Sequence, residues 1–422
     1  MNASEHTNAR RLTPDANRSG AGGGLFSTLL ARGCHALLDR MDARIEDGAI
    51  NGSLPDGSRR FLGGRAPGPN AEMNIRSWRA LVQIGWAGSV GLYEGWAAGE
   101  WDSPDPVQIF DLFVCNRASL KGAARPSLPM KVAGRLLHFL RRNNKAGSRR
   151  NIEFHYDLGN DFYAAWLDPG MTYSSALFDK PILPSQTLEQ AQDHKNAALL
   201  DRLQLNDGDS LLEIGCGWGG LAHAALAARD IDYRGVTLSH AQKAYADSRL
   251  LEYTGRVAVS ITDYRDVTGQ YDAIASVEMV EAVGQAYWPD YLDSIARCLK
   301  SGGRAAIQYI AIDDDAFEAY AANLDFIQRY IFPGGMLISE SRFRRLAQER
   351  GLLWQDQHDF GLDYAETLHR WRTQFDLAVA QKKLPAQFDE KFIGLWRFYL
   401  MYCEGGFRGG GIHVSQVTLT KK

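Results

Sequence analysis

The sequence of 422 residues contains no long apolar run. Its first residues, MNASEHTNARRLTPDANRSGAGGG, lack the apolar core of a signal peptide. No later segment approaches the roughly eighteen apolar residues of a membrane span. The sequence therefore predicts a cytoplasmic protein with a disordered tail over residues 1–24.

Cysteine is scarce, and no two cysteines have CxxC spacing. This scatter argues against a disulfide framework or a zinc site, and it fits a reducing compartment. We expect free thiols at all five positions and no metal site: Cys34, Cys115, Cys216, Cys298 and Cys403. Cys403 has no evident paired base in the sequence, which favours a structural thiol.

A strong excess of charge is also missing. The net charge is −3, with 45% apolar and 23% charged residues, as in a soluble globular protein. No global field points to nucleic acid, so any membrane contact must be local. The length predicts two or three domains.

Residues 25–125 are expected to form a small first domain. LFSTLLARGCHALLDRM has helical apolar spacing, and ARIEDGAINGSLPDGSRRFLGG indicates two strands that reverse at Pro-Asp-Gly. A basic linker over residues 126–150 follows, with these cations: Arg135, Arg141, Arg142, Lys145, Arg149 and Arg150. It is either a solvated linker or a patch that meets anionic lipid headgroups.

From about residue 187 the chain alternates helical and strand patterns, among them the strands SLLEIGC, YRGVTLS, VAVSITD, YDAIASV and RAAIQYIAI. This alternation predicts an α/β fold with a doubly wound, mostly parallel sheet, whose ligands bind at the carboxyl ends of the strands. Beyond residue 330 aromatic residues are frequent; we expect most in the core and some along a hydrophobic channel.

The segment LLEIGCGWGG places a glycine-rich turn between a strand and a helix. Its glycines, Gly215, Gly217 and Gly219, let the backbone approach a ligand closely. The GxGxxG spacing of a dinucleotide site is absent, and no basic residue offers a phosphate partner. Beginning at Glu213, the turn has the Glu-x-Gly-x-Gly-x-Gly form that S-adenosylmethionine methyltransferases use. A tight turn without a ligand is the alternative.

Several segments resemble, in this order, the cyclopropane fatty acid synthases and mycolic acid methyltransferases: FHYDLGNDFYAAWLDPGMTYSSALFD, TLEQAQDHK, EIGCGWGG, GVTLSHAQ, DYRD, RYIFPGG, HDFGLDYAETLHRW and CEGGFRGGGIHVSQVTLTKK. The resemblance covers roughly residues 150–422. It implies a class I, Rossmann-like methyltransferase domain over residues 151–422. GLYEGWAAGEWDSPD resembles, more loosely, the lipid-binding domain that precedes this unit in bacterial members.

Position by position, the resemblance implies that S-adenosylmethionine is bound in part by residues outside the glycine turn. These residues are Tyr173, Ser174, Thr237, Leu238, Gln242, Tyr264 and Arg265. Each of them has an alternative role in turn or capping chemistry.

Methyl transfer to an alkene needs a base, because the cation that forms must lose a proton. The resemblance implies that a bound bicarbonate removes it, held by a Cys, a Glu, a His, a backbone carbonyl and a Tyr. Here Ser175 stands for the Cys and Gln308 for the His, and the family's GMFEH reads EMVEA from Glu278 to Ala282. Glu281 and Tyr364 match the family, and Ile310 is placed to supply the carbonyl.

The family's glycine is therefore Glu278, and we expect its carboxylate to occupy the place of bicarbonate, which would then not be required. Gln308 would donate to this carboxylate, together with the hydroxyls of Ser175 and Tyr364. Like charge at Glu281 and burial would raise one pKa of the pair. The alternative is that Glu278 merely pairs with a nearby arginine.

The sequence thus predicts a C-methyltransferase that acts on the double bond of phospholipid acyl chains and forms a cyclopropane or a methylene- or methyl-branched chain. We expect peripheral contact with the anionic inner face of the membrane, no nucleic-acid partner, and leave a homodimer open. The rival hypothesis is a non-catalytic lipid-binding protein with a degenerate site. A methyltransferase for small soluble molecules would not need the first domain.

Overall fold

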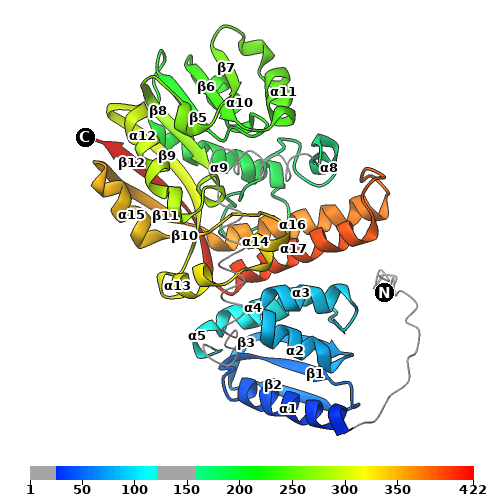
Figure 1. Ribbon diagram of the computed structural model, residues 1–422. Coiled ribbons are helices and arrows are strands. Elements are labelled where there is room, and N and C mark those ends of the chain that lie inside the picture. The colour runs from blue at the N-terminus through cyan, green and yellow to red at the C-terminus, as the bar shows by residue number, and fades with distance from the viewer. Residues whose placement is uncertain (1–24, 121–157) are drawn as a thin grey trace.

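The computed structural model describes residues 25–120 and 158–422. The expected tail and the basic linker lie outside these ranges. Figure 1 shows two units, with the first, drawn in blue and cyan, packed beneath the long helices α16 (Gly361–Ala380) and α17 (Glu390–Arg408) of the second. No helix within the described ranges is long and apolar enough to cross a membrane.

The first unit is a four-stranded sheet covered by short helices. The strands β1 (Asp47–Ser53) and β2 (Arg59–Gly63) pair antiparallel, as the Pro-Asp-Gly reversal predicts. The sheet order is β2-β1-β3-β4, with β1 and β3 parallel. The remaining elements are α1 (Leu25–Asp42), β3 (Ala66–Ile75), α2 (Trp78–Ala87), α3 (Ser89–Ala97), β4 (Trp101–Asp102), α4 (Pro106–Cys115) and α5 (Arg117–Leu120).

The second unit is built on a mostly parallel sheet of order β11-β12-β9-β8-β5-β6-β7, with β10 beside β9. Its strands are β5 (Ser210–Ile214), β6 (Asp232–Thr237), β7 (Val257–Ile261), β8 (Tyr271–Val277), β9 (Leu299–Ile312), β10 (Ile338–Ser339), β11 (Leu352–Asp359) and β12 (Ile412–Lys421). The predicted doubly wound fold is confirmed, and each apolar run expected as a strand forms one. The antiparallel pairs of β12 with β9 and β11 form the edge that the sequence did not predict.

Helices cover both faces of this sheet, which gives two apolar cores. One face carries α9 (Leu188–Leu203), α10 (Gly220–Ala228) and α11 (His240–Arg249), and the other carries α12 (Trp288–Cys298) and α15 (Glu340–Glu349). Short helices lie in the connections: α8 (Asn160–Ala164), α13 (Asp314–Ala322) and α14 (Phe326–Tyr330). The glycine turn after β5 therefore opens at the carboxyl edge of the sheet, where ligands of such folds bind.

The two units meet where α17 packs on α4. A Cβ added at Gly405 would lie 2.4 Å from the Phe110 Cβ and 2.9 Å from the Val107 carbonyl oxygen. Asp325 and Ser89 add a hydrogen bond of 2.7 Å across the boundary. The close approach of the helices thus requires the absence of a side chain at Gly405.

We expect Gly405→Ala to destabilise the protein by roughly 1–3 kcal/mol, because the added methyl group overlaps backbone and Cβ atoms that cannot move independently. Gly394→Ala is the matched control on the same helix, since its Cβ would meet Trp96 at an ordinary 3.7 Å. The control should be neutral or gain up to about 1 kcal/mol of helix propensity. Denaturant unfolding measures both, and equal changes would contradict this account of the contact.

Candidate active site

A cavity of about 1450 Å³ begins at the carboxyl edge of the large sheet and continues into the first unit. Its sheet end is lined by the glycine turn, and its far end by apolar side chains of the small sheet and its helices, including Leu38, Ile50 and Met73. Ligand pockets commonly hold about 300–1,000 Å³. The cavity is therefore large enough for a cofactor and a second, elongated molecule.

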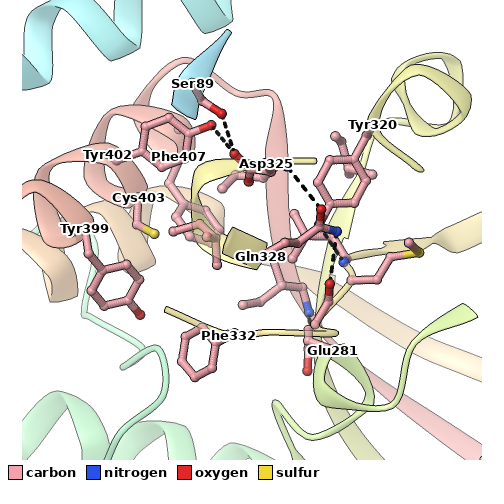
Figure 2. Close-up of a pocket in the computed structure, with 18 of the residues that line it drawn as sticks. Ser89, Glu281, Tyr320, Asp325, Gln328, Phe332, Tyr399, Tyr402, Cys403 and Phe407 are labelled. Carbon is pink, nitrogen blue, oxygen red and sulfur yellow. Dashed lines mark hydrogen bonds between the residues drawn. The ribbon is translucent and has the colours of Figure 1, made fainter. Parts of the chain in front are cut away.

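Aromatic side chains surround the middle of the cavity. Figure 2 shows Phe332 close to Glu281, and Tyr399 and Phe407 near Cys403. The sequence predicted that some of the aromatic residues beyond 330 would line a channel, and Tyr364, Tyr399 and Tyr402 do so. Aromatic faces of this kind can stabilise a passing positive charge.

Glu278 lies at the end of β8 with its carboxylate held by three donors. Oε1 accepts from the Ser175 backbone N–H at 2.8 Å and from Gln308 Nε2 at 2.8 Å, while Oε2 accepts from the Tyr364 hydroxyl at 2.7 Å. Within the described ranges no arginine pairs with Glu278, so the alternative of an arginine partner is wrong there. The carboxylate is fixed in place with neutral donors only.

The orientation of the Gln308 amide is set from behind. Gln416 on β12 donates to Gln308 Oε1 at 3.0 Å, which leaves Gln308 Nε2 facing Glu278. The expected donation from Gln308 is therefore present. The Ser175 hydroxyl differs from the expectation, because it donates to the Ala176 carbonyl at 3.0 Å while the Ser175 backbone N–H contacts Glu278.

The backbone of Glu278 is left-handed, with a φ of 48°. Residues other than glycine are uncommon in this region, and strain of about 1–3 kcal/mol persists there mainly at functional sites. Glycine, which the resemblance implies at this position, adopts such a backbone without this strain. Here a carboxylate is kept in spite of the backbone cost.

Glu281 does not share the hydrogen-bond donors of Glu278. Its Oε1 accepts a hydrogen bond from the Ile310 backbone N–H. The expected role of the Ile310 carbonyl stays a prediction. Its Oε2 is buried without a partner in the described part of the chain. Burial and the neighbouring Glu278 raise the pKa of Glu281 to about 8, so it is largely neutral at pH 7.

Burial also raises the pKa of Glu278, but the hydrogen bonds from Tyr364, Ser175 and Gln308 oppose the rise by stabilising the charged form. Of the two carboxyls, Glu278 is therefore the one held for ionisation. These pKa shifts are consistent with the expectation that burial and like charge raise a pKa in this pair of carboxyls.

The residues expected at the cofactor lie largely along one wall of the cavity. Those that line it are Tyr173, Ser174, Glu213, Gly215, Gly217, Thr237, Leu238, Gln242 and Tyr264. Gly219 and Arg265 are not among the lining residues that the structure describes. A Cβ at Gly219 would instead meet Ala246 at 3.2 Å, and Arg265 pairs with Asp263 at 2.7 Å.

The wall suits S-adenosylmethionine because it leaves open space beside the glycine turn, where the cofactor would pass. Gly217 has a φ of 52°, and a Cβ there would meet nothing within 4 Å. The Thr237 hydroxyl donates to Gln242 Oε1 at 2.8 Å, which fixes the amide at the end of β6. We propose that Thr237 and Gln242 hold the ribose and that Tyr264 borders the adenine.

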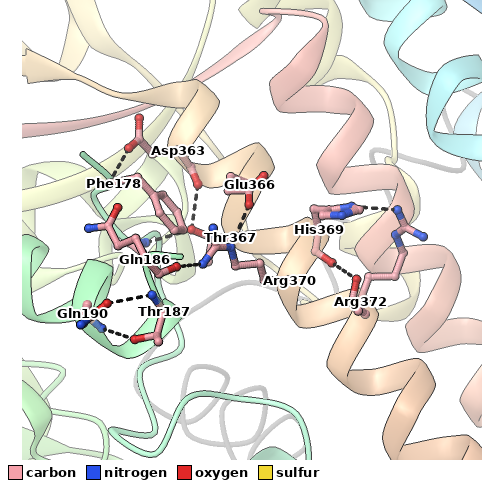
Figure 3. A network of polar contacts seen from close by, with 12 residues as sticks. Phe178, Gln186, Thr187, Gln190, Asp363, Glu366, Thr367, His369, Arg370 and Arg372 are labelled. Carbon is pink, nitrogen blue, oxygen red and sulfur yellow. Dashed lines mark hydrogen bonds and ion pairs between the residues drawn. The ribbon is translucent and has the colours of Figure 1, made fainter. Parts of the chain in front are cut away.

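The loop that carries Ser174 and Ser175 is fastened to α16. Asp363 accepts from the Phe178 backbone N–H at 2.7 Å, and the Thr367 hydroxyl oxygen accepts from the Ala176 N–H at 3.1 Å (Figure 3). The same figure shows the capping box of Thr187 and Gln190 that begins α9. Loop and helix thus reach the cavity as fixed elements.

Five cysteines are free, as predicted, and Cys403 lines the cavity beside Tyr399. Burial raises the pKa of the Cys403 thiol. The sequence analysis did not identify Lys195, Asn196 or Phe332 as cavity residues. The family-like TLEQAQDHK segment was the available signal for Lys195.

Residues 143–417 match the family model described as mycolic acid cyclopropane synthetase. The chain is 38% identical to the tuberculostearic acid methyltransferase of Mycobacterium tuberculosis, over 81% of each protein. It is 32% identical to the cyclopropane-fatty-acyl-phospholipid synthase of Escherichia coli, over 88% of this chain and 90% of that one. A solved mycolic acid cyclopropane synthase, complexed with SAH and CTAB, superposes with a TM-score of 0.60 at 28% identity, covering 65% of this chain and 98% of that one.

We expect Gly217→Val to abolish S-adenosylmethionine binding measured by calorimetry, because its side chain enters the open space beside the turn. Gly208→Val is the matched control: Gly208 also has a positive φ, of 89°, and open space around it, but it is exposed and outside the cavity lining. The control should carry the backbone strain and retain binding. Binding by a folded Gly217→Val variant would contradict the assignment of this wall.

Proposed function

This chain belongs to the mycolic acid cyclopropane synthetase family and is an S-adenosylmethionine-dependent methyltransferase; we propose that it methylates the double bond of an unsaturated phospholipid acyl chain, with Glu278 as the base. The observation that carries the proposal is the Glu278 carboxylate, held by Tyr364, Gln308 and the Ser175 N–H on a left-handed backbone. Bound S-adenosylmethionine supplies an electrophilic methyl group.

The residues of the protein position the alkene, shield the cation from water and remove its proton. With the cofactor held beside the glycine turn, its methyl group would be transferred to one alkene carbon as the methyl–sulfur bond breaks, and the neighbouring alkene carbon would carry the positive charge. Tyr364, Tyr399 and Phe407 present aromatic faces to the cavity, which stabilise this cation and exclude water.

Glu278 accepts one proton from the methylated chain. The electrons of the broken C–H bond close a cyclopropane ring or, after a hydride shift to the cationic carbon, form a methylene double bond. A saturated methyl branch would additionally need a separate hydride donor. Since the base is part of the chain, bicarbonate has no step to perform.

The cavity supports an acyl substrate because its far end is apolar. The proposed lipid-binding role of the first unit follows from Leu38, Ile50, Leu62, Met73 and Leu81, which line that end. Trp86, on α2, lines the cavity and is 53% exposed. Val82 on the same helix is 46% exposed. These side chains would contact the membrane peripherally while the acyl chain enters. The homodimer stays a prediction.

We expect Glu278→Gln to lower turnover roughly 10²–10⁴-fold, the range for a missing general base, while S-adenosylmethionine binding persists. In the unmodified protein activity should rise with pH through the raised pKa of Glu278, because only the ionised carboxylate accepts a proton. Bicarbonate depletion should leave turnover unchanged. Lipid mass spectrometry measures the product in each case.

Glu278→Gly gives a sharper comparison, because it removes the carboxylate and relieves the left-handed backbone. Added bicarbonate or formate should partly restore its turnover by entering the vacated space, whereas Glu278→Gln, whose amide fills that space, should not respond. Wild-type turnover in Glu278→Gln, or dependence of the unmodified enzyme on bicarbonate, would show that Glu278 is not the base.

For the membrane contact, we expect Trp86→Ser to weaken sedimentation with phospholipid vesicles several-fold, because a large aromatic surface no longer enters the lipid interface. Charge reversal at Arg141, Arg142, Arg149 and Arg150 should weaken binding to anionic vesicles only, and less so at high salt. Leu251→Ser is the control, since Leu251 is 71% exposed on the second unit. Equal losses for Trp86 and Leu251 would rule out a specific contact at α2.

A further inference from the structure

Helix α9 turns a polar face toward the interior of the protein. Gln192, Lys195 and Asn196 are buried, with exposed fractions of 1%, 2% and 5%. Lys195 and Asn196 line the cavity at its sheet end, beside Ser174, Glu213 and the glycine turn. The helix thus supplies polar groups to the part of the cavity that the apolar acyl chain would not occupy.

In the described part of the chain, all three side chains have a polar group without an adequate partner, but only Lys195 and Asn196 line the cavity; Gln192, whose Oε1 is unpaired, does not. Within the described ranges, the only hydrogen-bond acceptor for the Lys195 ammonium is the Ser174 hydroxyl, at 3.3 Å. Asn196 Oδ1 has no partner there at all. A buried ammonium and a buried amide oxygen each cost free energy unless they are paired. Both groups therefore point to a ligand that supplies the missing hydrogen-bond partners.

The ligand must offer an acceptor to Lys195 and a donor to Asn196. Burial lowers the pKa of Lys195 to about 8, and the charges of Glu278, Asp168 and Glu213 oppose that effect, so Lys195 remains largely cationic at pH 7. The matching acceptor is an anion, and a carboxylate forms the strongest common pair with an ammonium. A cationic donor suits Asn196 Oδ1, with Glu213 on the same wall. These requirements together describe an α-amino acid zwitterion.

We propose that Lys195 and Asn196 clamp the amino acid end of the cofactor, Lys195 binding its carboxylate and Asn196 its ammonium. The proposal rests on S-adenosylmethionine as the cofactor, and it is independent of the role of Glu278. It assigns binding to helix α9, whereas the sequence analysis placed the cofactor residues in the loop before this helix, in the glycine turn and in the segments that follow the turn.

Two hydrogen bonds hold α9 and the segment before it in place beside the cavity. Gln192 Nε2 donates to the Ser174 carbonyl at 2.8 Å, which joins α9 to the loop of Ser174 and Ser175. The Arg370 guanidinium donates to the Gln186 carbonyl just before the capping box, as Figure 3 shows. A preorganised pair of this kind loses little conformational entropy on binding.

The test compares ligands with and without the amino acid end by calorimetry on the full chain. S-adenosylhomocysteine carries both charged groups, and 5′-deoxy-5′-methylthioadenosine carries neither. We expect Lys195→Met to weaken S-adenosylhomocysteine binding about 10–100-fold, as for a lost charged hydrogen bond. Binding of methylthioadenosine should change less than about twofold, which also shows that the variant is folded.

A decarboxylated S-adenosylmethionine separates the two arms of the clamp. It should bind the unmodified protein and Lys195→Met equally, while Asn196→Leu should weaken it as it weakens S-adenosylhomocysteine. Lys243→Met is the control variant: Lys243 lies on α11 and pairs with Asp247, and it should leave every affinity unchanged.

Three outcomes would overturn the clamp. The first is unchanged S-adenosylhomocysteine binding by Lys195→Met, which would mean that Lys195 only balances the charge of Glu278. The second is an equal weakening of methylthioadenosine binding by the same variant, which would indicate a structural role. A third measurement needs no variant: if the unmodified protein binds decarboxylated and complete S-adenosylmethionine with equal affinity, no group in the site recognises the carboxylate.

Discussion

The carboxylate of Glu278 joins three parts of the chain that are remote in sequence. Its donors come from the loop before α9, from β9 and from α16, so the hydrogen bonds fix the sheet, the loop and the helix pair relative to one another. A charged acceptor strengthens each of these bonds relative to a neutral one. The same contacts that would prepare a base for the reaction therefore also hold the walls of the cavity together.

This arrangement depends on a balance of buried charges. Lys195 is a buried cation among Glu278, Glu213 and Asp168, and Glu281 is largely neutral because of burial and the neighbouring Glu278. An additional ionised carboxylate would face a strong cost in so little water. The two carboxyls thus differ in their surroundings. Neutral donors surround Glu278, whereas Glu281 Oε2 has no hydrogen-bond partner in the described part of the chain.

Much of the fold follows from local patterns, since buried parallel strands are continuous apolar runs and their order is apparent from the alternation with helices. The geometry of the site depends on contacts between residues that are remote in sequence, which no local pattern reveals. Gln416 orients Gln308 across a separation of 108 residues, through the antiparallel pairing of β12 with β9. Ser175 was expected to act through its hydroxyl, but the loop turns its N–H toward Glu278. Arg265 was expected to help bind the cofactor, whereas the structure pairs it with Asp263, two residues before it in the chain, and leaves it out of the described cavity lining.

Helix α17 has a different neighbour on each of its sides. Gly405 packs against α4 of the first unit, whereas Tyr399 and Cys403 belong to the wall of the cavity. A rigid helix cannot move one side and leave the other in place. A tilt of α17 as a rigid body would therefore change the packing between the two units and the shape of the cavity together.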